Sequence, residues 1–587
     1  MKKIMAKYLK WLLLPIIHEP LFFLIVVFCI FLPHFINEMD SPQPILVELR
    51  WIAICISNPI AISYVLTWLV WITKNKLLKI IMLAFVIFLM FVNLFLFYNF
   101  YTLLSPWILL LIEETNINES SEFISQYAFS TGTIISLFIS LLVIITLLFC
   151  SKHNMILRRK WQKVFFALSL ICVLPVGVYM LAKTIQLPFL RTQLAIEEWY
   201  EKRGAYANNN TIANIIYSSH YLNVSGADNK KAIQSSVEAT RQPVQCIEQD
   251  SLNVVFIIGE SFSKHHASIY GYNLNTTPSL CAEQKKQNLF VFQDAVSPYN
   301  MTTFSVKNIF STNSLSKREP WYSKPMFPVI FKKAGYHVTF WDNQKPNENV
   351  NSYDYAVGSY LYATQIIPIA YNKTNSQTCE YDLQFIQLFQ KNNRQHGKHN
   401  LDIIHLMGQH SDAAQRFPNE QKYKVFKVSD INNDLNQAQK QSVADYDNAT
   451  LYNDHVIQAL INMYRNSSTV LVYLSDHGEE VYDYRNHLGR THERKKTPQS
   501  LKYQYQIPFV VWCSDKYIEK HPNIVNSLRH AMNKPFLSSD ISHMLLSLGA
   551  IKSPYYLPDK DILNEHYQCG KRMIQDRIDY DKIMNNE

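Results

Sequence analysis

The sequence predicts a protein of two parts: an α-helical membrane domain with five transmembrane helices, then an α/β domain with a mainly parallel, doubly wound sheet. Almost all long apolar runs lie before residue 184, whereas short β-rich runs alternate with helical patterns after residue 250. At 587 residues the chain is too long for one ordinary domain. With 48% apolar and 18% charged residues, 14 Gly and 9 Cys, it is not a disordered chain, a collagen or a disulfide scaffold.

Five apolar stretches in the first part have roughly the length, about 18 to 25 residues, that crosses a bilayer. They run Pro20–Ile36, Trp51–Ile72, Leu77–Tyr98, Tyr127–Cys150 and Val164–Ala182. A buried core helix is the alternative for each, but five of them separated by short polar turns favour membrane spans. Lysines precede the first stretch as in a signal peptide, yet no small-residue cleavage site follows it. We therefore interpret it as a retained anchor.

The charges of the connecting loops predict the orientation of these spans, because Lys and Arg accumulate in short cytoplasmic loops. The loops after the second and fourth spans are basic and contain Lys74, Lys76, Lys79, Lys152, Arg158, Arg159, Lys160 and Lys163. The other two loops are acidic or neutral apart from Arg50. Five crossings that start inside place the chain after about residue 184 outside the cytoplasm.

This organisation divides the chain into a transmembrane anchor of residues 1–183, a connector of residues 184–250 and an outer domain of residues 251–587. The polar connector shows little periodicity apart from an amphipathic piece around Ala195–Lys202. Five cysteines lie in the outer part, so at least one of them is unpaired. The formal net charge of +9 reflects topology and compatibility with anionic lipid. No basic stripe with interleaved aromatic residues is present, so we expect no nucleic-acid partner.

Short runs in the outer domain are apolar on both faces, as in strands buried within a parallel sheet. The five candidate strands are Asn253–Ile258, His337–Trp341, Leu401–Leu406, Thr469–Leu474 and Pro508–Trp512. In such sheets, ligands bind outside the carboxyl ends of the strands. The residues that directly follow each run are therefore the candidates for chemistry.

Side chains that bind metals follow three of these runs. Glu260 follows the first run, His410 lies just beyond the third, and Asp476 and His477 follow the fourth. Taken singly, a solvated loop carboxylate or a helix cap is the ordinary interpretation. Three strand ends that deliver such groups to one edge favour a metal site, and carboxylate oxygen and imidazole nitrogen are ligands that Zn²⁺ accepts.

A longer ordered set of motifs surrounds these residues. It consists of Gly259-Glu260, Tyr270-Gly271-Tyr272, Thr276-Thr277-Pro278, Ser297–Ser305, His405–His410, Tyr446-Asp447-Asn448 and Ser475–Glu479. The set resembles the phosphoethanolamine transferases, which belong to the alkaline phosphatase and sulfatase superfamily and modify lipopolysaccharide in Gram-negative bacteria. The five spans extend this resemblance over essentially the whole chain. The continuation Glu479–Asp483 resembles the branch that acts on core sugars more than the lipid A branch.

The resemblance implies an enzyme of the bacterial inner membrane with a periplasmic catalytic domain, in which Thr302 is the nucleophile. It implies a zinc ion held by Glu260, Thr302, Asp476 and His477. Coordination to zinc favours the alkoxide of a hydroxyl that is otherwise a poor nucleophile. Thr302 would take phosphoethanolamine from phosphatidylethanolamine and pass it to lipopolysaccharide, on a core sugar or on lipid A, with ping-pong kinetics.

Further residues receive roles by the same resemblance. His410 and either His487 or His492 would serve the substrate phosphate, a second zinc or the leaving group. Thr115 and Glu119, in the loop between spans three and four, would contact the ethanolamine end of the donor lipid. A solvated polar loop is the alternative for these last two residues.

Three points stay open at this level. His405 lies within an apolar strand and is either a core imidazole or a support for a ligand. Thr303 is the nucleophile if the register slips by one residue. The best-known members of the family flank the nucleophile with a cysteine pair, whereas this chain has Pro298 and Asn308 there, which puts the rigidity of the segment in question.

Competing functions make different demands on the sequence. A sulfatase needs a C/S-x-P-x-R stretch for conversion to formylglycine, and the sequence contains none. A phosphoglycerol transferase of the lipoteichoic-acid type shares the five spans and the threonine nucleophile, but the His405–His410 and Thr276–Pro278 motifs favour phosphoethanolamine. A catalytically inactive membrane scaffold would have lost its metal-type residues, which this chain retains.

Overall fold

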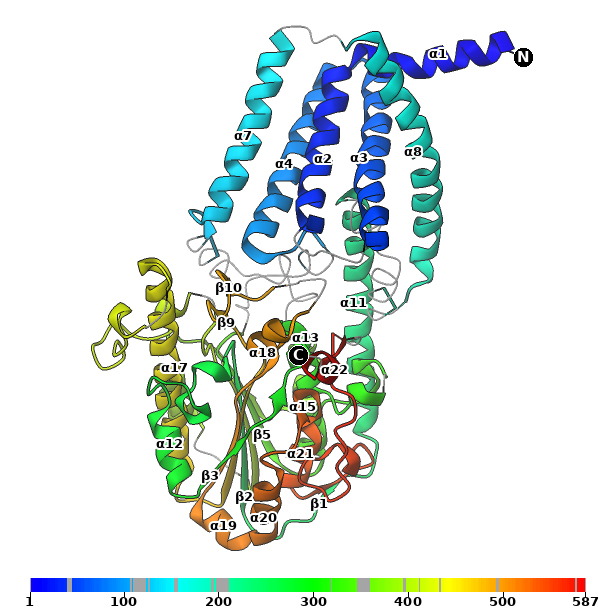
Figure 1. Cartoon of the computed structure of the whole chain (residues 1–587). Helices are drawn as coiled ribbons and strands as arrows, with labels where there is room; N and C mark the ends of the chain where they lie inside the picture. The colour runs from blue at the N-terminus through cyan, green and yellow to red at the C-terminus, as the bar shows by residue number, and fades with distance from the viewer. Residues whose placement is uncertain are drawn as a thin grey trace. The chain divides into compact units, whose positions relative to one another are not determined.

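The computed structural model divides into two compact units, one of Met1–Ser225 and one of Gly226–Arg490 with Lys496–Glu587 (Figure 1). The structure describes residues 2–39, 45–105, 108, 123–124, 127–152, 157–191, 195–196, 211–317, 319–345, 359–393, 397–410, 412–431, 434–491, 496–575 and 578–585.

The first unit consists of long helices, as its apolar runs predict. They are α1 (Lys2–His18), α2 (Pro20–Met39), α3 (Ile45–Thr73), α4 (Lys76–Phe100), α7 (Thr131–Lys152) and α8 (Arg159–Gln186). Five of the described helices, α2, α3, α4, α7 and α8, are long and apolar enough to cross a membrane, which confirms the predicted spans. Large apolar side chains such as Phe138 and Ile145 are 62% and 60% exposed on α7, as expected for a face that contacts lipid.

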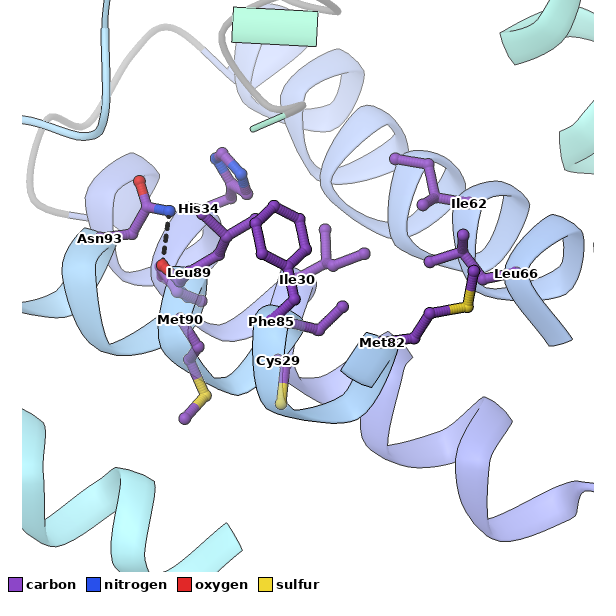
Figure 2. Close-up of a pocket in the computed structure, with 12 residues that line it drawn as sticks. Cys29, Ile30, His34, Ile62, Leu66, Met82, Phe85, Leu89, Met90 and Asn93 are labelled. Carbon is purple, nitrogen blue, oxygen red and sulfur yellow. Dashed lines mark hydrogen bonds between the residues drawn. The ribbon is translucent and has the colours of Figure 1, made fainter. Parts of the chain in front are cut away.

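A pocket lies among the side chains of α2, α3 and α4 (Figure 2). It is lined by Cys29, Ile30, Pro33, His34, Ile62, Leu66, Met82, Phe85, Val86, Leu89, Met90 and Asn93. The Asn93 side chain donates a hydrogen bond of 2.9 Å to the Leu89 carbonyl at one end of it. The lining contains no carboxylate and none of the predicted site residues, so the predicted chemistry belongs elsewhere.

The connector contains more structure than the sequence indicated. Thr211–Ala239 forms helix α11, in a segment interpreted above as polar with little periodicity. Its residues Tyr217 and Tyr221 are buried, at 1% and 0% exposure. Tertiary packing of these few large side chains, rather than a continuous apolar stripe, stabilises this helix. Most of the predicted amphipathic piece, after Ile196, lies outside the described residues.

The second unit is built on a seven-stranded sheet with the order β3-β11-β8-β2-β7-β5-β6. The strands are β2 (Leu252–Gly259), β3 (Leu289–Phe292), β5 (His337–Asp342), β6 (Lys373–Thr374), β7 (His399–His405), β8 (Thr469–Ser475) and β11 (Phe509–Cys513). β11 pairs antiparallel with β3 and with β8, whereas the other strand pairs of the sheet are parallel. The mainly parallel sheet and all five predicted strands are confirmed. Strands β3 and β6 were not predicted, because they are too short to give a clear pattern.

Helices cover both faces of this sheet, because successive side chains of a strand point to opposite sides. Val254, Phe256 and Ile258 of β2 pack with α13 (Thr302–Phe310), α14 (Phe327–Lys333) and α21 (Ile541–Leu548). Val255 and Ile257 pack with α12 (Pro278–Lys285), α16 (Asp382–Asn392) and α17 (Gln437–Tyr464). Figure 1 shows α12 and α17 on one side of the sheet and α21 on the other. The fold is therefore doubly wound, as predicted.

Shorter elements complete this unit. They are β1 (Gln245–Cys246), β4 (Ala295–Val296), α15 (Ile367–Ala370), β9 (Glu480–Val481), β10 (Leu488–Gly489), α18 (Pro498–Tyr505), α19 (Asp515–Lys520), α20 (Pro522–Ala531), β12 (Phe536–Leu537), β13 (Ile551–Lys552), β14 (Met573–Ile574), β15 (Ile578–Asp579) and α22 (Tyr580–Met584). The hairpin of β9 and β10 follows β8 directly in the chain, and it bears on the site described next.

The packing of β2 gives a first prediction. Ile257 is fully buried between the central sheet and α17, so Ile257→Ala leaves a cavity and lowers the free energy of unfolding by about 2 to 5 kcal/mol. Denaturant unfolding of the detergent-solubilised protein measures this loss. Ile247→Ala is the control, because Ile247 is 47% exposed. We expect a change within about 0.5 kcal/mol for the control, and equal losses for the two variants would contradict the assigned core.

Candidate functional site

The three predicted strand ends meet at one edge of the sheet. Strands β8, β2 and β7 are neighbours and parallel, so the residues that follow them lie side by side. The Asp476 N–H donates to the Gly259 carbonyl at 2.9 Å, and the Gln409 N–H donates to the Glu260 carbonyl at 3.0 Å. The chain segments that carry the candidate residues are thus joined by backbone hydrogen bonds just beyond the sheet.

Glu260, Asp476 and His477 form a buried cluster there. One ligand atom from each lies within 4.8 Å of the others, and each side chain is 0% exposed. His477 Nε2 lies 3.3 Å from Glu260 Oε1 and 3.1 Å from Asp476 Oδ2. Within the described residues this is the one group of His, Cys, Asp and Glu side chains with metal-binding spacing.

The hydrogen bonds of the cluster leave acceptor atoms pointing at one another. Asp476 Oδ1 accepts from the N–H groups of Ser261 at 3.1 Å and His477 at 2.8 Å, but Oδ2 is buried without a hydrogen bond. His477 Nδ1 lies 2.9 Å from the Gly478 carbonyl and donates to it, so Nε2 carries the lone pair. Three acceptors that converge on one buried point fit a cation, and the oxygen and nitrogen donors fit zinc.

Two buried carboxylates at this distance do not both ionise without a compensating charge. Burial and the neighbouring Glu260 raise the pKa of the Asp476 carboxyl well above its usual range. A divalent cation between the two groups removes this conflict, because its own charge dominates the local electrostatics. The charge balance of the cluster therefore also fits a metal ion.

Thr302 brings a hydroxyl into the cluster. It is the first residue of α13, and its Oγ1 lies 3.0 Å from Glu260 Oε2 and 3.3 Å from His477 Nε2. Thr303 is the next residue of α13 and is buried at 1% exposure. Thr302, rather than Thr303, is therefore the hydroxyl that contacts the metal-type residues.

The segment before Thr302 is fixed without the cysteine pair that the resemblance led us to look for. The Ser297 hydroxyl donates to the Asp476 carbonyl at 2.5 Å and lies 3.2 Å from the Ser305 hydroxyl. The Asn308 side chain donates to the Phe304 carbonyl at 2.8 Å within α13. None of the nine cysteines, all of which lie among the described residues, forms a disulfide bond. Hydrogen bonds from Ser297 thus tie the threonine segment directly to the cluster.

Glu260 is oriented by the strained residue that follows it. Ser261 has a φ of 55°, in the left-handed region that non-glycine residues rarely adopt. Its hydroxyl donates to Glu260 Oε1 at 2.7 Å, and its carbonyl accepts from the Tyr446 hydroxyl at 2.6 Å. Strain of this kind persists only where the surroundings hold it, and it concentrates at functional sites.

His405 supports Glu260 through an intermediate side chain. Its Nδ1 lies 2.9 Å from Asp342 Oδ1, and its Nε2 lies 3.2 Å from Gln344 Nε2. Gln344 in turn donates to Glu260 Oε2 at 3.2 Å. Burial lowers the pKa of His405, but the Asp342 carboxylate outweighs it and raises that pKa overall. Of the two interpretations left open for His405, the structure favours a support for a ligand.

Of the remaining predicted residues, the structure describes His410 and His487. Burial lowers the pKa of His410 to about 4 and outweighs the nearby Glu260, which raises it. The imidazole of His410 is therefore neutral near pH 7. His487 is buried in the turn between β9 and β10, and burial lowers its pKa to about 3. Neither belongs to the three-residue cluster. His492, Thr115 and Glu119 lie outside the described residues.

One charged residue of the site was not predicted. The guanidinium of Arg490 donates from Nη1 to His477 Nε2 at 2.7 Å, and its Nε lies 3.2 Å from Glu479 Oε2. No local pattern marks Arg490, because it lies in a polar loop and its place depends on the pairing of β9 with β10.

Comparison with known proteins agrees with this geometry. The Sulfatase family model matches residues 252–550. The chain belongs to the sulfatase family. Phosphoethanolamine transferase EptC of Escherichia coli K12 is 28% identical over 492 residues, which are 81% of either chain. These matches confirm the resemblance to the phosphoethanolamine transferases.

Two solved structures extend the comparison. The C-terminal periplasmic domain of E. coli EptC, in complex with Zn, is 27% identical with a TM-score of 0.50, covering 58% of this chain and 96% of that chain. The integral membrane lipooligosaccharide phosphoethanolamine transferase A of Neisseria meningitidis has a TM-score of 0.60 at 16% identity, covering 94% and 97%. This second match shows the fold alone, and it includes the multi-pass membrane part.

His266, which pairs with Asp447 of α17, gives a prediction on pH dependence. His266 lies 2.7 Å from Asp447 and 3.3 Å from Asp483, and so links α17 to the hairpin after the site. Burial lowers its pKa, but the two carboxylates outweigh burial and raise the pKa to about 10. The resulting stability is fully present below the ordinary pKa of about 6.5 and is lost as the pH rises through 10.

His266→Gln should therefore lower the free energy of unfolding by about 3 to 5 kcal/mol at pH 6, because a buried charge pair loses one partner. The difference from the unsubstituted protein should shrink as the pH approaches 10, which denaturant unfolding across this range measures. His530→Gln, at an exposed position, is the control. A difference that stays constant from pH 6 to 10 would show that His266 is not charged in the folded protein.

Proposed function

We propose that this protein is a zinc-dependent phosphoethanolamine transferase that moves phosphoethanolamine from phosphatidylethanolamine to lipopolysaccharide. The observation that carries the proposal is the Thr302 hydroxyl, which lies within 3.3 Å of two residues of a buried, cation-binding cluster. Relatives named phosphoethanolamine transferases match the chain over most of its length. Others are named for Kdo(2)-lipid A or lipooligosaccharide as the molecule modified.

Zinc fits the donors that the cluster offers. Glu260, Asp476 and His477, with the Thr302 hydroxyl, would hold the ion, and the E. coli EptC domain was crystallised with Zn. When bound, zinc supplies a Lewis acid that lowers the pKa of a hydroxyl and neutralises charge developing on phosphoryl oxygens. The orphaned Asp476 Oδ2 supports this assignment from the chain itself.

The first half of the reaction is a displacement at phosphorus. The Thr302 oxygen loses its proton and bonds to the phosphorus of phosphatidylethanolamine, while the bond from phosphorus to the diacylglycerol oxygen breaks. That oxygen takes up a proton and leaves as diacylglycerol, so protons balance. Glu260, which accepts the Thr302 hydrogen bond, orients the hydroxyl for this attack.

The second half regenerates the threonine. An acceptor hydroxyl or phosphate of lipopolysaccharide, on a core sugar or on lipid A, bonds to the phosphorus of the phosphothreonine, and an acceptor hydroxyl gives up its proton. The bond from phosphorus to the Thr302 oxygen breaks, and this oxygen takes up a proton. His410, whose lowered pKa keeps it a neutral base near pH 7, and His487 are the candidates for moving this proton. One nucleophile thus serves two lipids in turn, which fits a single cluster.

The membrane part fits lipid substrates. The five spans anchor residues 1–183 in the inner membrane, and the loop charges place the catalytic domain of residues 251–587 in the periplasm. The E. coli relative carries its catalytic domain in that compartment. In the loop between the third and fourth spans, Thr115 and Glu119 remain candidates for contact with the ethanolamine of the donor.

Substitution of the nucleophile tests the proposal. Thr302→Ala should leave a folded, membrane-inserted protein and reduce transfer at least about 1000-fold, because no oxygen remains to form the covalent intermediate. Mass spectrometry of lipopolysaccharide from cells that carry the variant measures the loss and locates the attached group. Thr303→Ala is the matched control, since it removes the neighbouring buried hydroxyl of the same helix. Full modification with Thr302→Ala, or loss only with Thr303→Ala, would refute Thr302 as the nucleophile.

Metal removal is a separate test. Thorough chelation should abolish transfer, and stoichiometric Zn²⁺ should restore it, because the hydroxyl needs a Lewis acid. Metal analysis of purified Glu260→Gln should also show reduced zinc, since one of the two carboxylates of the cluster is lost. Activity that withstands chelation would exclude a metal-dependent mechanism at this site.

A further inference from the structure

A hairpin beyond the site carries two arginines, and each faces one of two successive glutamates. Strands β9 and β10 pair with Gly489 opposite Glu480, so Arg490 comes to lie beside Glu479. Arg485, in the turn of the hairpin, pairs with Glu480. Successive residues of an extended segment point to opposite sides. The arginine that pairs with Glu479 therefore lies on a different side of the hairpin from the arginine that pairs with Glu480.

The two arginines are held differently. Arg485 donates from Nε at 2.8 Å and from Nη2 at 2.9 Å to the two oxygens of Glu480, so its fork is used on one carboxylate. Glu480 also accepts from Gln504 at 3.0 Å. The Nε of Arg490 lies 3.2 Å from Glu479 Oε2, and its Nη1 donates to His477 Nε2 at 2.7 Å. Arg485 is therefore a structural tie within the hairpin, whereas Arg490 reaches the metal-type cluster.

The tip of Arg490 lies beside the predicted nucleophile. Its Nη1 is 2.7 Å from His477 Nε2, and the Thr302 hydroxyl is 3.3 Å from the same nitrogen. Nη1 also lies 3.5 Å from the carbonyl of Asn300, in the segment that leads to Thr302. The guanidinium and the hydroxyl therefore lie beside the same nitrogen, and an ion bound to that nitrogen would release Nη1 for another acceptor.

A positive group at this point matches the substrate. A phosphodiester is an anion, and the charge of the proposed Zn²⁺ is already balanced by the carboxylates of Glu260 and Asp476, so a further positive group favours its binding. Arginine presents planar paired N–H donors that match phosphoryl oxygens, and it stays charged at all relevant pH values. A fixed cation next to the attacked phosphorus also stabilises the charge that develops on the oxygens in the transition state.

We propose that Arg490 is a catalytic residue that binds the non-bridging oxygens of the phosphoryl group attacked by Thr302, and that Glu479 positions it. This inference rests on the proposed function and adds the group that recognises the phosphodiester. Arg490 forms no covalent bond in the reaction. Its N–H donors hold the phosphoryl oxygens while the bond from Thr302 to phosphorus forms and the bond to diacylglycerol breaks.

Binding of inorganic phosphate to the zinc-loaded, full-length protein in detergent tests this role. By isothermal titration calorimetry, Arg490→Gln should weaken phosphate binding about tenfold or more, with zinc content and melting temperature unchanged. Arg490→Lys keeps the charge but loses the fork, so it should bind phosphate with intermediate affinity. Arg485→Lys, in the same hairpin, is the matched control and should bind phosphate like the unsubstituted protein.

The rate of phosphothreonine formation, followed by mass spectrometry of the protein with phosphatidylethanolamine, is the second readout. We expect Arg490→Gln to slow it roughly 100-fold. Unchanged phosphate affinity in Arg490→Gln, equal weakening in Arg485→Lys, or loss of zinc in both Arg490 variants would overturn the proposal. Should the unsubstituted protein fail to cleave phosphatidylethanolamine, the proposed function would fall, while the phosphate titration would still decide whether Arg490 binds phosphoryl oxygens.

Discussion

The site depends on the contact between two buried carboxylates, Glu260 and Asp476, at the ends of neighbouring parallel strands. In water each would be ionised, but here burial and mutual repulsion oppose the second charge. The lone pair of His477 Nε2 is directed at the same point. A divalent cation would satisfy all three groups together, at the place where Thr302 presents its hydroxyl.

Close approach of the backbone makes this contact possible. Strand register alone brings the ends of β8, β2 and β7 to one edge, but the ligands meet only because the loops beyond the strands pack without side chains between them. At Gly408, a Cβ would lie 2.8 Å from the carbonyl oxygen of Glu260, and φ is +50°. At Gly478, a Cβ would lie 2.3 Å from the Tyr503 carbonyl oxygen. Larger residues at either position would push the ligand loops apart.

The elements with strong local patterns were predictable, and those that depend on tertiary pairing were not. Five membrane spans and five buried strands follow from apolar runs, and the rule that ligands gather at carboxyl strand ends brought Glu260, Asp476 and His477 together. Thr302 needed the family resemblance, because nothing local distinguishes it from Thr303. Helix α11 was missed because its buried tyrosines are sparse. Arg490 was missed because its place depends on the pairing of two-residue strands, β9 and β10, which carry too little pattern to be recognised.

The hairpin also shows how one motif serves both the fold and the chemistry. In Asp476-His477-Gly478-Glu479-Glu480, the first two residues belong to the metal-type cluster and the third allows the chain to pass close to Tyr503. The last two then diverge, since Glu480 fixes the hairpin through Arg485 and Gln504 while Glu479 faces the site. Because Glu480 and its partners are tied to each other, the hairpin stays in place independently of the cluster. The hairpin can therefore hold the charged side chain of Arg490 beside the threonine.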